Sequence, residues 1–506
     1  MSLKGAVLVC GTSSDVGKSR IVGGLCRVLA QDGIRVAPFK AQNMSLNSCV
    51  TVTGHEVARS VEYQAIAART TTEVGMNPIL LKPSGEKTSQ LIVMGRPVGE
   101  FRADDLQAGT HRLSVERLSD VVHEALLELR SRFDVVIAEG AGGAAEINLL
   151  ERDLVNLPLA LRAQIPAVLV GDIERGGVFS SLYGTVALLP DELRAQIRGF
   201  VINKFRGERR LLDSGIVELE RRCNIPCLGV VPHLGELAID AKDSLNLVSS
   251  PRVVSRVGDG PPIDVAVIAL PRLSNFTDFE PLGVESGVTL RYVAHSNALG
   301  DPDLIIVPGS KSTVDDLAWM RRRGIDLVVV DALRRATSLL GICAGYQMFG
   351  AVIEDDVESH AGRVPGLGIL EVNTVFEREK CTLRRSGTDR AGVAVDGFEI
   401  HHGRPVKSDD QLPWLFLDGP GGRCEEEGVA DPGRGVFATS LHGIFESDDF
   451  RRSFLERVAA RRGKSFISSP TSFEVRRQSE IDRVAEALST YLDINALREI
   501  IAEGRL

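Results

Sequence analysis

The chain has 506 residues, which is too many for one hydrophobic core and predicts two or three domains. Its content of 43% hydrophobic and 25% charged residues is that of an ordinary soluble globular protein. The formal net charge of −9 argues against general binding to nucleic acids, whereas a small anionic substrate needs only a local basic pocket.

The eight cysteines are scattered along the chain and form no dense framework that would predict disulfide bonds. The first residues lead through a short apolar run into a glycine-rich loop, which predicts a first strand rather than a signal peptide. No apolar run reaches the length that a membrane-spanning helix needs. We therefore expect a protein of the reduced cytoplasm that binds neither a membrane nor nucleic acid.

Short apolar runs alternate with longer amphipathic stretches between residues 1 and 235. Apolar residues recur at helical spacing between Leu118 and Leu129, for example. This alternation predicts an α/β fold in which a mainly parallel, doubly wound sheet has helices on both faces. The expected strands are Ala6–Cys10, Arg35–Phe39, Asp134–Ala138, Ala167–Gly171, Gly199–Asn203 and Cys227–Val231.

A phosphate-binding loop follows the first expected strand and precedes a helical stretch. Glycines allow backbone N–H groups to point at a phosphate, and the helix N-terminus adds positive potential. The Lys18 ammonium would neutralise phosphate oxygens, and the Ser19 hydroxyl would bind Mg²⁺ held between phosphates. The expected nucleotide-binding residues of this loop are Gly11, Thr12, Gly17, Lys18 and Ser19.

An acidic residue and an amide residue each lie at the carboxyl end of an expected strand, where open α/β sheets bind ligands. Glu139 comes directly after a buried strand, and its carboxylate would bind Mg²⁺ opposite the phosphate loop, with a turn or helix-cap acid as the alternative. Asn203, followed by Lys204, ends another strand and would contact the purine of a nucleotide.

A polar loop after the second expected strand is a candidate substrate site. It contains Lys40, Gln42 and Asn43, whose side chains would hold carboxylates and carboxamides. From composition alone, a solvent-exposed polar loop is an equally good interpretation.

The second half repeats the α/β pattern after a break. Residues 236–262 lack the alternating pattern and end in the string SSPRVVSRVGDGPP, which predicts a linker. A new alternating pattern extends over residues 263–455. Residues 456–506 end in an amphipathic helix that we expect to dock on one of the domains. Its apolar positions are Ile481, Val484, Ala485, Leu488 and Leu492.

A strand-to-helix turn in this half carries Cys343. An apolar run ends on the cysteine, and the small residues Ala344 and Gly345 precede a helical stretch. This pattern predicts a sharp, strained elbow that lifts the sulfur out of the sheet. The positive end of the helix dipole would favour a thiolate there. We favour a nucleophilic cysteine over a buried structural one.

Two further segments suit the same chemistry. The strand before Pro308 leads into Gly309 and Ser310, whose backbone N–H groups would form an oxyanion hole. His442, at the end of another apolar strand, would take the thiol proton and return it to a leaving amine. Because a lone histidine is usually structural, the assignment of His442 depends on Cys343.

Long strings of this chain resemble the cobyric acid synthases, which are CobB/CobQ-type glutamine amidotransferases of the cobalamin pathway, over essentially the whole length. The phosphate loop is one residue longer than the usual motif and resembles the dethiobiotin synthetase branch of P-loop enzymes. The strings that carry the resemblance are GTSSDVGKS, PFKAQNMSLNS, MNPILLKP, EGAGGAAEINL, GDIERGGVF, ALPRLSNFTDFEPL, VPGSKST, GICAGYQMFG, FEIHHG and LHGIFE.

The resemblance implies an amidation reaction divided between two domains. Residues 1–235 would bind ATP, Mg²⁺ and a corrinoid, and residues 263–455 would be a class I glutamine amidotransferase domain that hydrolyses L-glutamine through a Cys343 thioester. Released ammonia would displace phosphate from an activated corrinoid carboxylate. In the family the substrate is adenosylcobyrinic acid a,c-diamide, amidated at positions b, d, e and g. Because free ammonia would be lost to water, we expect the two sites to be coupled.

One departure from the family pattern concerns the partner of His442. Class I amidotransferases usually have a glutamate two residues after the histidine, where this chain has Ile444. Glu446 or Glu399 would then orient His442, or the site would be a dyad. The alternatives for the whole chain are a cobyrinic acid a,c-diamide synthase and, in another class, an ATP-dependent switch protein of the ParA type.

Overall fold

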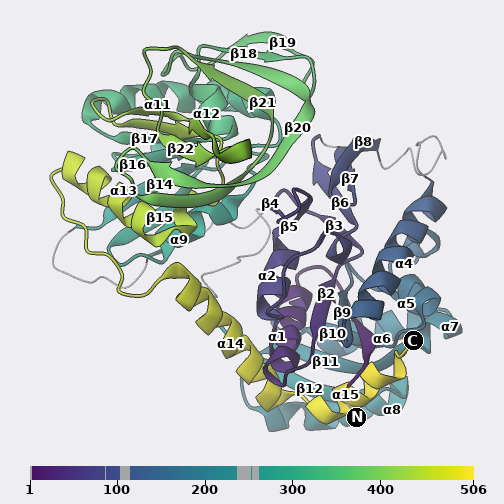
Figure 1. The fold of residues 1–506 in the computed structure, drawn as a ribbon. Coiled ribbons are helices and arrows are strands. Elements are labelled where there is room, and N and C mark those ends of the chain that lie inside the picture. Colours follow the sequence, from purple (N-terminus) through teal and green to yellow (C-terminus); the bar gives the residue numbers. More distant parts are fainter. Residues whose placement is uncertain (1–2, 86, 103–113, 236–251, 254–260) are drawn as a thin grey trace.

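The computed structural model describes residues 3–85, 87–102, 114–235, 252–253 and 261–506 (Figure 1). Figure 1 shows the N-terminal half, in purple and blue, beside the C-terminal half, in teal and green, with the yellow C-terminal helices returning to the N-terminal half. Within these ranges no helix combines the length and the hydropathy that crossing a membrane requires.

A six-stranded, entirely parallel sheet forms the N-terminal half, and all six strands expected there are confirmed. Alternate residues of the first strand face two cores, because Leu8 packs on one side of the sheet and Val7 and Val9 on the other. In spatial order the strands are β12 (Cys227–Pro232), β11 (Ile197–Phe205), β10 (Ala167–Asp172), β1 (Gly5–Gly11), β9 (Val135–Glu139) and β2 (Val36–Phe39).

Helices cover both faces of this sheet, as the doubly wound prediction requires. The helical spacing between Leu118 and Leu129 corresponds to one helix, whose apolar stripe is buried against the sheet. The helices of this half are α1 (Lys18–Gln31), α2 (Arg59–Ala67), α4 (Val115–Arg132), α5 (Leu157–Ala163), α6 (Val178–Leu188), α7 (Asp191–Arg194) and α8 (Asp213–Cys223).

An insertion between β2 and α4 was not expected from the sequence. It comprises a four-stranded sheet in the order β3-β6-β7-β8 and a separate β4–β5 hairpin. The hairpin packs against the C-terminal half, where Val57 joins Phe398 and Ile400 in one buried cluster. The strands are β3 (Gln42–Met44), β4 (Ser48–Val50), β5 (Glu56–Ala58), β6 (Ile79–Pro83), β7 (Thr88–Val93) and β8 (Arg96–Arg102).

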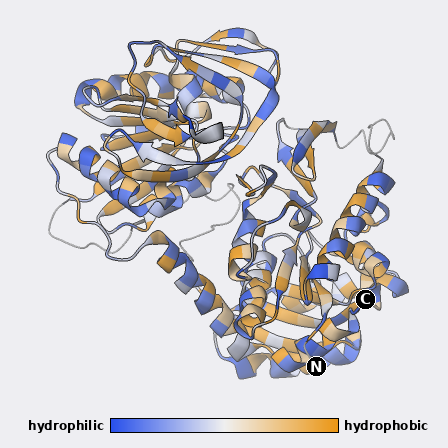
Figure 2. Ribbon diagram, viewed as in Figure 1, coloured by the Kyte–Doolittle hydropathy of each residue, from blue (hydrophilic) through white to orange (hydrophobic). Residues whose placement is uncertain are grey.

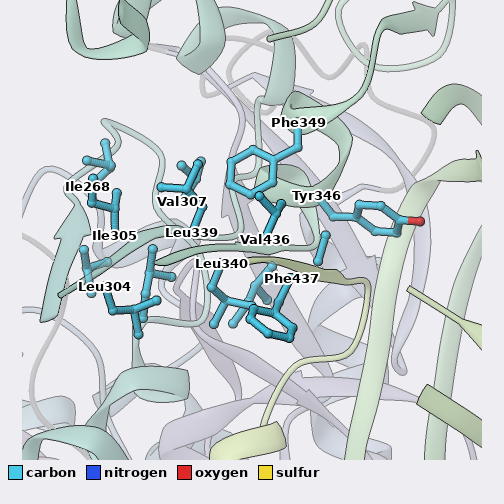
Figure 3. Close-up of a cluster of buried hydrophobic side chains, with 14 of the residues drawn as sticks. Ile268, Leu304, Ile305, Val307, Leu339, Leu340, Tyr346, Phe349, Val436 and Phe437 are labelled. Carbon is cyan, nitrogen blue, oxygen red and sulfur yellow. The ribbon is translucent and has the colours of Figure 1, made fainter. Parts of the chain in front are cut away.

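The C-terminal half is built on a seven-stranded sheet in which five neighbouring strands are parallel and both edge strands are antiparallel. Figure 3 shows its apolar core, where Val307 and Leu339 of the strands lie near Phe349 of a following helix and Leu340 lies beside Phe437. In spatial order the strands are β13 (Arg252–Val253), β15 (Val288–Val293), β14 (Ile263–Ile268), β16 (Leu304–Val307), β17 (Ser338–Ile342), β25 (Val436–Thr439) and β24 (Val429–Asp431).

A second, mixed sheet packs beside this one and contains a long hairpin of β20 and β21. Its strands are β18 (Val352–Asp355), β19 (Gly362–Pro365), β20 (Val372–Asp389), β21 (Ala394–Lys407), β22 (Leu415–Asp418) and β23 (Cys424–Glu427). The helices of the C-terminal half are α9 (Glu280–Gly283), α10 (Thr313–Arg322), α11 (Ile325–Ala332), α12 (Ala344–Phe349) and α13 (Asp448–Arg461). In Figure 2 hydrophobic residues concentrate along the central strands of both halves.

Most of the expected linker at residues 236–262 lies outside the described residues. Within it, Arg252–Val253 form β13, which pairs antiparallel with β15 at the edge of the seven-stranded sheet.

The chain ends in two helices, α14 (Phe473–Tyr491) and α15 (Ile494–Glu503), that pack on the N-terminal half. The expected apolar stripe of α14 is confirmed, since it is buried in the same cluster as α1. Gly24 of α1 permits this close approach, because a Cβ atom there would lie 2.5 Å from the Leu488 Cδ1 atom. The C-terminal segment therefore ties the second half of the chain back to the first sheet.

Truncation of Leu488 tests this docking. Leu488 is 1% exposed, so Leu488→Ala should lower the free energy of unfolding by about 2–5 kcal/mol through lost burial and a residual cavity. Val475→Ala is the matched control, because Val475 lies on the same helix but is 59% exposed. Urea unfolding followed by circular dichroism measures both variants. Equal stability losses in the two variants would contradict the docking.

Candidate active sites

Cys343 stands at the sharp turn between β17 and α12, as expected. Its backbone angles, φ 51° and ψ −104°, are strained for a residue with a Cβ atom. Two glycines permit the turn: a Cβ on Gly345 would collide with the Val307 carbonyl, and one on Gly341 would lie 2.8 Å from the Gly345 backbone. The Cys343 sulfur is buried and faces the Ile400 carbonyl oxygen at 3.9 Å.

His442 lies beside Cys343 and is oriented by a buried acid. Its Nδ1 atom donates to the Asp278 Oδ2 atom at 2.6 Å, and the other carboxylate oxygen accepts from the Gly443 N–H at 2.9 Å. The ring stacks on Phe398, with centroids 5.5 Å apart. Because Nδ1 is engaged by the carboxylate, Nε2 is the nitrogen available to the cysteine.

The electrostatic environment makes His442 a cation. Burial lowers the pKa of His442, but the Asp278 carboxylate and the Cys343 sulfur outweigh that effect and raise the pKa to about 10. A protonated imidazole beside the sulfur stabilises a thiolate. Cys343, His442 and Asp278 therefore lie next to one another in a site nearly closed to water.

The prediction that Glu446 or Glu399 orients His442 is wrong. The Glu446 carboxylate pairs instead with Arg59 and Arg477, and the Glu399 carboxylate lies near Arg385 and His401. The sequence reasoning missed Asp278 because it lies 164 residues before His442. The only signal was its position inside the string ALPRLSNFTDFEPL.

Gly309 and Ser310 follow β16 and lie next to this pair. A Cβ atom on Gly309 would be 2.9 Å from the His442 Cε1 atom, so only glycine fits there. The Gly309 carbonyl accepts from the Ser274 N–H at 2.9 Å, and the Ser310 hydroxyl donates to Asp316 at 2.6 Å. The structure thus brings the expected oxyanion residues to the cysteine and histidine.

The pocket over Cys343 has walls from both halves of the chain. Lys82 of β6 reaches it from the N-terminal half, and Lys380 of β20 reaches it from the C-terminal half. Both ammonium groups pair with the buried Glu56 carboxylate, at 2.7 and 2.6 Å. Burial raises the pKa of Glu56, but the two lysines hold it well below its usual range. The pocket is therefore completed only where the two halves meet.

Cys381, Glu399 and His401 form a buried group beside this pocket whose ligand atoms lie close enough for one metal ion. The Arg385 Nε atom, however, lies 3.6 Å from the Glu399 carboxylate, and Arg404 interacts with the Cys381 sulfur. These two guanidinium groups already supply positive charge, so electrostatics disfavours a cation there.

The phosphate loop has the geometry of an anion cradle. Gly17 has φ 97°, and the Lys18 ammonium spans the loop between the Ser13 and Gly142 carbonyl oxygens, each at 2.8 Å. Burial lowers the pKa of Lys18. Asn203 lies against the same loop, since its side-chain N–H donates to the Val16 carbonyl at 2.7 Å. A phosphate at this position would meet the ammonium and the first turn of α1.

Four side chains from separate elements converge behind the loop. The Ser19 hydroxyl donates to the Glu139 Oε1 atom at 2.7 Å, the Lys40 ammonium pairs with the same oxygen at 2.8 Å, and Gln64 of α2 donates to Oε2. Burial raises the pKa of Glu139, but Lys40 and the two hydrogen bonds lower it below its usual value. The hydroxyl and carboxylate oxygens are ligands that Mg²⁺ prefers, so the residues fit this ion.

Other expected ligand residues lie around this group. Gln42 and Asn43 are half-buried in β3, and the Asn43 amide donates to the Ser60 hydroxyl at 3.2 Å. The Gly11 carbonyl accepts from the Ala144 N–H at 2.8 Å, and the Thr12 N–H donates to the Val170 carbonyl of β10 at 3.0 Å. Lys40, expected in a substrate loop, is buried against Glu139.

Comparison with solved structures gives only short overlaps. A structure described as "Crystal structure of glutamine amidotransferase" is 22% identical, covers 38% of this chain and 98% of its own, and has a TM-score of 0.30. The FtsY signal recognition particle receptor of Elizabethkingia anophelis with GDP is 16% identical over 46% of this chain and 57% of its own, with a TM-score of 0.28.

Family models and curated relatives match far more of the chain. Residues 7–247 match a CobQ/CobB/MinD/ParA nucleotide binding domain, and residues 264–450 match a CobB/CobQ-like glutamine amidotransferase domain. Cobyric acid synthase of Frankia casuarinae is 45% identical over 99% of this chain and 98% of its own length. The enzymes of Rhodococcus jostii and Streptomyces coelicolor are 46% and 45% identical over 99% of this chain and 96% and 97% of theirs. The chain belongs to the cobyric acid synthase family.

Proposed function

We propose that the chain hydrolyses glutamine and uses the ammonia, with ATP, to amidate side-chain carboxylates of a corrinoid in cobalamin biosynthesis. The observation that carries this proposal is the buried Cys343–His442–Asp278 arrangement in a chain that also holds a phosphate cradle. The similarity to cobyric acid synthases over nearly the whole length supports the corrinoid substrate. We place the reaction in the cytoplasm.

Glutamine hydrolysis would follow from the geometry around Cys343. The thiolate attacks the carboxamide carbon, and backbone N–H groups at Gly309 and Ser310 stabilise the developing oxyanion. Protonated His442 gives its proton to the departing nitrogen, which leaves as ammonia, and a thioester remains. His442 then takes a proton from water, which attacks the thioester and releases glutamate. Asp278 keeps the imidazole ring in the required orientation throughout.

Amidation would occur at the phosphate loop. A corrinoid carboxylate attacks the terminal phosphoryl group of ATP and releases ADP. Ammonia then attacks the acyl carbon, loses a proton to water and displaces phosphate, which leaves the amide. Lys18 neutralises phosphate oxygens, and Asn203, which donates to the loop at the Val16 carbonyl, is the proposed contact to the nucleotide. A Mg²⁺ ion held by Ser19 and Glu139 would neutralise charge on the phosphates. Gln42 and Asn43 are the proposed contacts to the corrinoid.

The proposed division of labour follows the two halves. Residues 1–235 form the amidating domain, residues 263–455 form the glutaminase domain, and residues 456–506 form the extension. Its boundary needs a correction, because α13 continues to Arg461 with Val458 and Ala459 in the core of the glutaminase half, whereas α14 and α15 pack on the first domain. The substrate we propose is adenosylcobyrinic acid a,c-diamide, amidated at b, d, e and g. A ParA-type switch is disfavoured, because a switch has no use for a buried cysteine, histidine and aspartate in one pocket.

Mass spectrometry of the product tests the proposed function. With cobyrinic acid a,c-diamide, ATP, Mg²⁺ and glutamine, we expect four added amides. Cys343→Ala should add none with glutamine but four with ammonium salt, because only the ammonia source is lost. No amidation of the diamide, but two amides added to free cobyrinic acid, would identify an a,c-diamide synthase instead.

Asp278→Asn tests the orientation of His442. We expect kcat for glutamine hydrolysis to fall by about 10²–10⁴-fold, with ammonium-dependent amidation retained. The folded state raises the pKa of His442 from 6.5 to about 10. The resulting stabilisation is fully present below about pH 6.5 and is lost as the pH rises through about 10. Unfolding free energies measured from pH 6.5 to 10 should therefore fall more steeply in the wild type than in Asp278→Asn; parallel curves would refute the assignment.

Glu139→Gln tests the proposed metal ligand. Loss of the carboxylate charge should weaken Mg²⁺-dependent ATP use and lower the amidation rate by about 10²-fold or more with either nitrogen source. Asp134→Asn is the matched control, since Asp134 precedes the same strand but pairs with Arg35 at the surface. Amidation kinetics against Mg²⁺ concentration measure both. An unchanged Mg²⁺ dependence in Glu139→Gln would exclude this residue as a ligand.

A further inference from the structure

The turn that carries Asp278 is held by hydrogen bonds from the N-terminal half. The Ser48 N–H donates to the Asn275 Oδ1 atom at 2.9 Å, and the Thr277 hydroxyl donates to the Asn47 side-chain oxygen at 3.0 Å. All four of these side chains are buried. The contacts lie one and three residues from the acid that orients His442, so a shift of this turn would move that acid.

The segment after His442 is contacted by the same part of the N-terminal half. The Asn47 carbonyl accepts from the Arg59 N–H at 3.1 Å, and the Arg59 guanidinium pairs with Glu446. Glu446 lies four residues after His442 and also pairs with Arg477 of α14 at 2.8 Å. Asn47 therefore touches the Asp278 turn directly and is linked to the segment after His442 through Arg59.

These contacts continue to the phosphate loop through two short connections. Asn47 follows strand β3, and β3 is preceded by Lys40, which pairs with the Glu139 carboxylate at 2.8 Å. Helix α2 starts at Arg59 and carries Gln64 one turn later, and Gln64 donates to the same carboxylate. The phosphate loop and the glutaminase histidine are thus connected by residues 40–47, which include β3, and by helix α2 of nine residues.

Ser48, which follows Asn47 at the start of β4, is anchored in a buried cluster of charged side chains. The Ser48 hydroxyl donates to the Glu56 carboxylate at 2.8 Å and accepts from Lys82 at 2.9 Å. Lys380 of the C-terminal half pairs with the same carboxylate at 2.6 Å. A buried charge cluster of this kind favours one arrangement of its groups. Displacement at Lys40 would therefore be passed to the Asp278 turn.

We propose that Asn47, Asn275 and Thr277 are positioning residues for glutamine hydrolysis. They make the orientation of Asp278, and through it of His442, depend on occupancy of the ATP and corrinoid site. Glutamine is then hydrolysed fast only when an activated carboxylate awaits ammonia. The inference rests on the proposed function, because it assigns the means by which the two reactions are coupled.

The Thr277 hydroxyl gives the sharpest test, because Thr277→Val removes it with almost no change of shape and Thr277→Ser keeps it. Glutaminase kcat and KM are measured with and without ATP, Mg²⁺ and cobyrinic acid a,c-diamide, beside ammonium-dependent amidation. In the wild type we expect the ligands to raise glutaminase activity by about 5–150-fold. Thr277→Val should lower that factor by about threefold or more, while Thr277→Ser and ammonium-dependent amidation stay near wild type.

Arg384→Ala is the control for a general loss of contact between the halves. Arg384 is half-exposed and pairs with Glu62 across the same boundary at 3.5 Å, but it does not touch the Asp278 turn. It should keep the full ligand-dependent increase. An unchanged increase in Thr277→Val, or an equal loss in Arg384→Ala, would overturn the proposal. A parallel loss of ammonium-dependent amidation in Thr277→Val would also overturn it. Absence of both activities in the wild type would instead refute the proposed function, and this inference with it.

Discussion

The hydrogen bond between His442 and Asp278 depends on the whole architecture. A buried carboxylate is costly unless it is paired and hydrogen-bonded, and here the imidazole and the Gly443 N–H satisfy both oxygens of Asp278. The same pairing keeps His442 charged beside Cys343. Neither residue is brought near the other by local sequence, so the site exists only when the seven-stranded sheet is complete and the turn before α9 is held against it.

The boundary between the halves carries charge that neither half could bury alone. Glu56 of the N-terminal insertion lies between Lys82 and Lys380, and Arg59 pairs with Glu446. Removing one partner from such a cluster would leave an uncompensated charge, so the two halves are held in one arrangement. The pocket over Cys343 takes its walls from both sides of this boundary, which would place the proposed release of ammonia next to the proposed amidating half.

Local patterns predicted much of the fold and part of the site. The six strands of the first sheet and the Cys343 elbow were read correctly, because alternation of apolar runs and small residues at a turn are local signals. The strands of the insertion are as short as three residues, which is too few to show the alternation of apolar and polar residues that predicts a strand. Asp278 was missed, and Glu446 and Glu399 were named instead, because pairing across 164 residues leaves no local spacing. The stripe of α14 indicated a docked helix, but the partner, α1, followed only from the packing at Gly24.

The protonation state of His442 is the most direct test of this account. Nuclear magnetic resonance of protein with ¹⁵N-labelled histidine rings, assigned with His442→Gln, would follow the two ring nitrogens from pH 6 to 10.5. We expect His442 to remain doubly protonated at pH 8 and to titrate near pH 10, because Asp278 and Cys343 stabilise its charge. Titration near the ordinary value of 6.5 would show that this charge is absent and would contradict the mechanism.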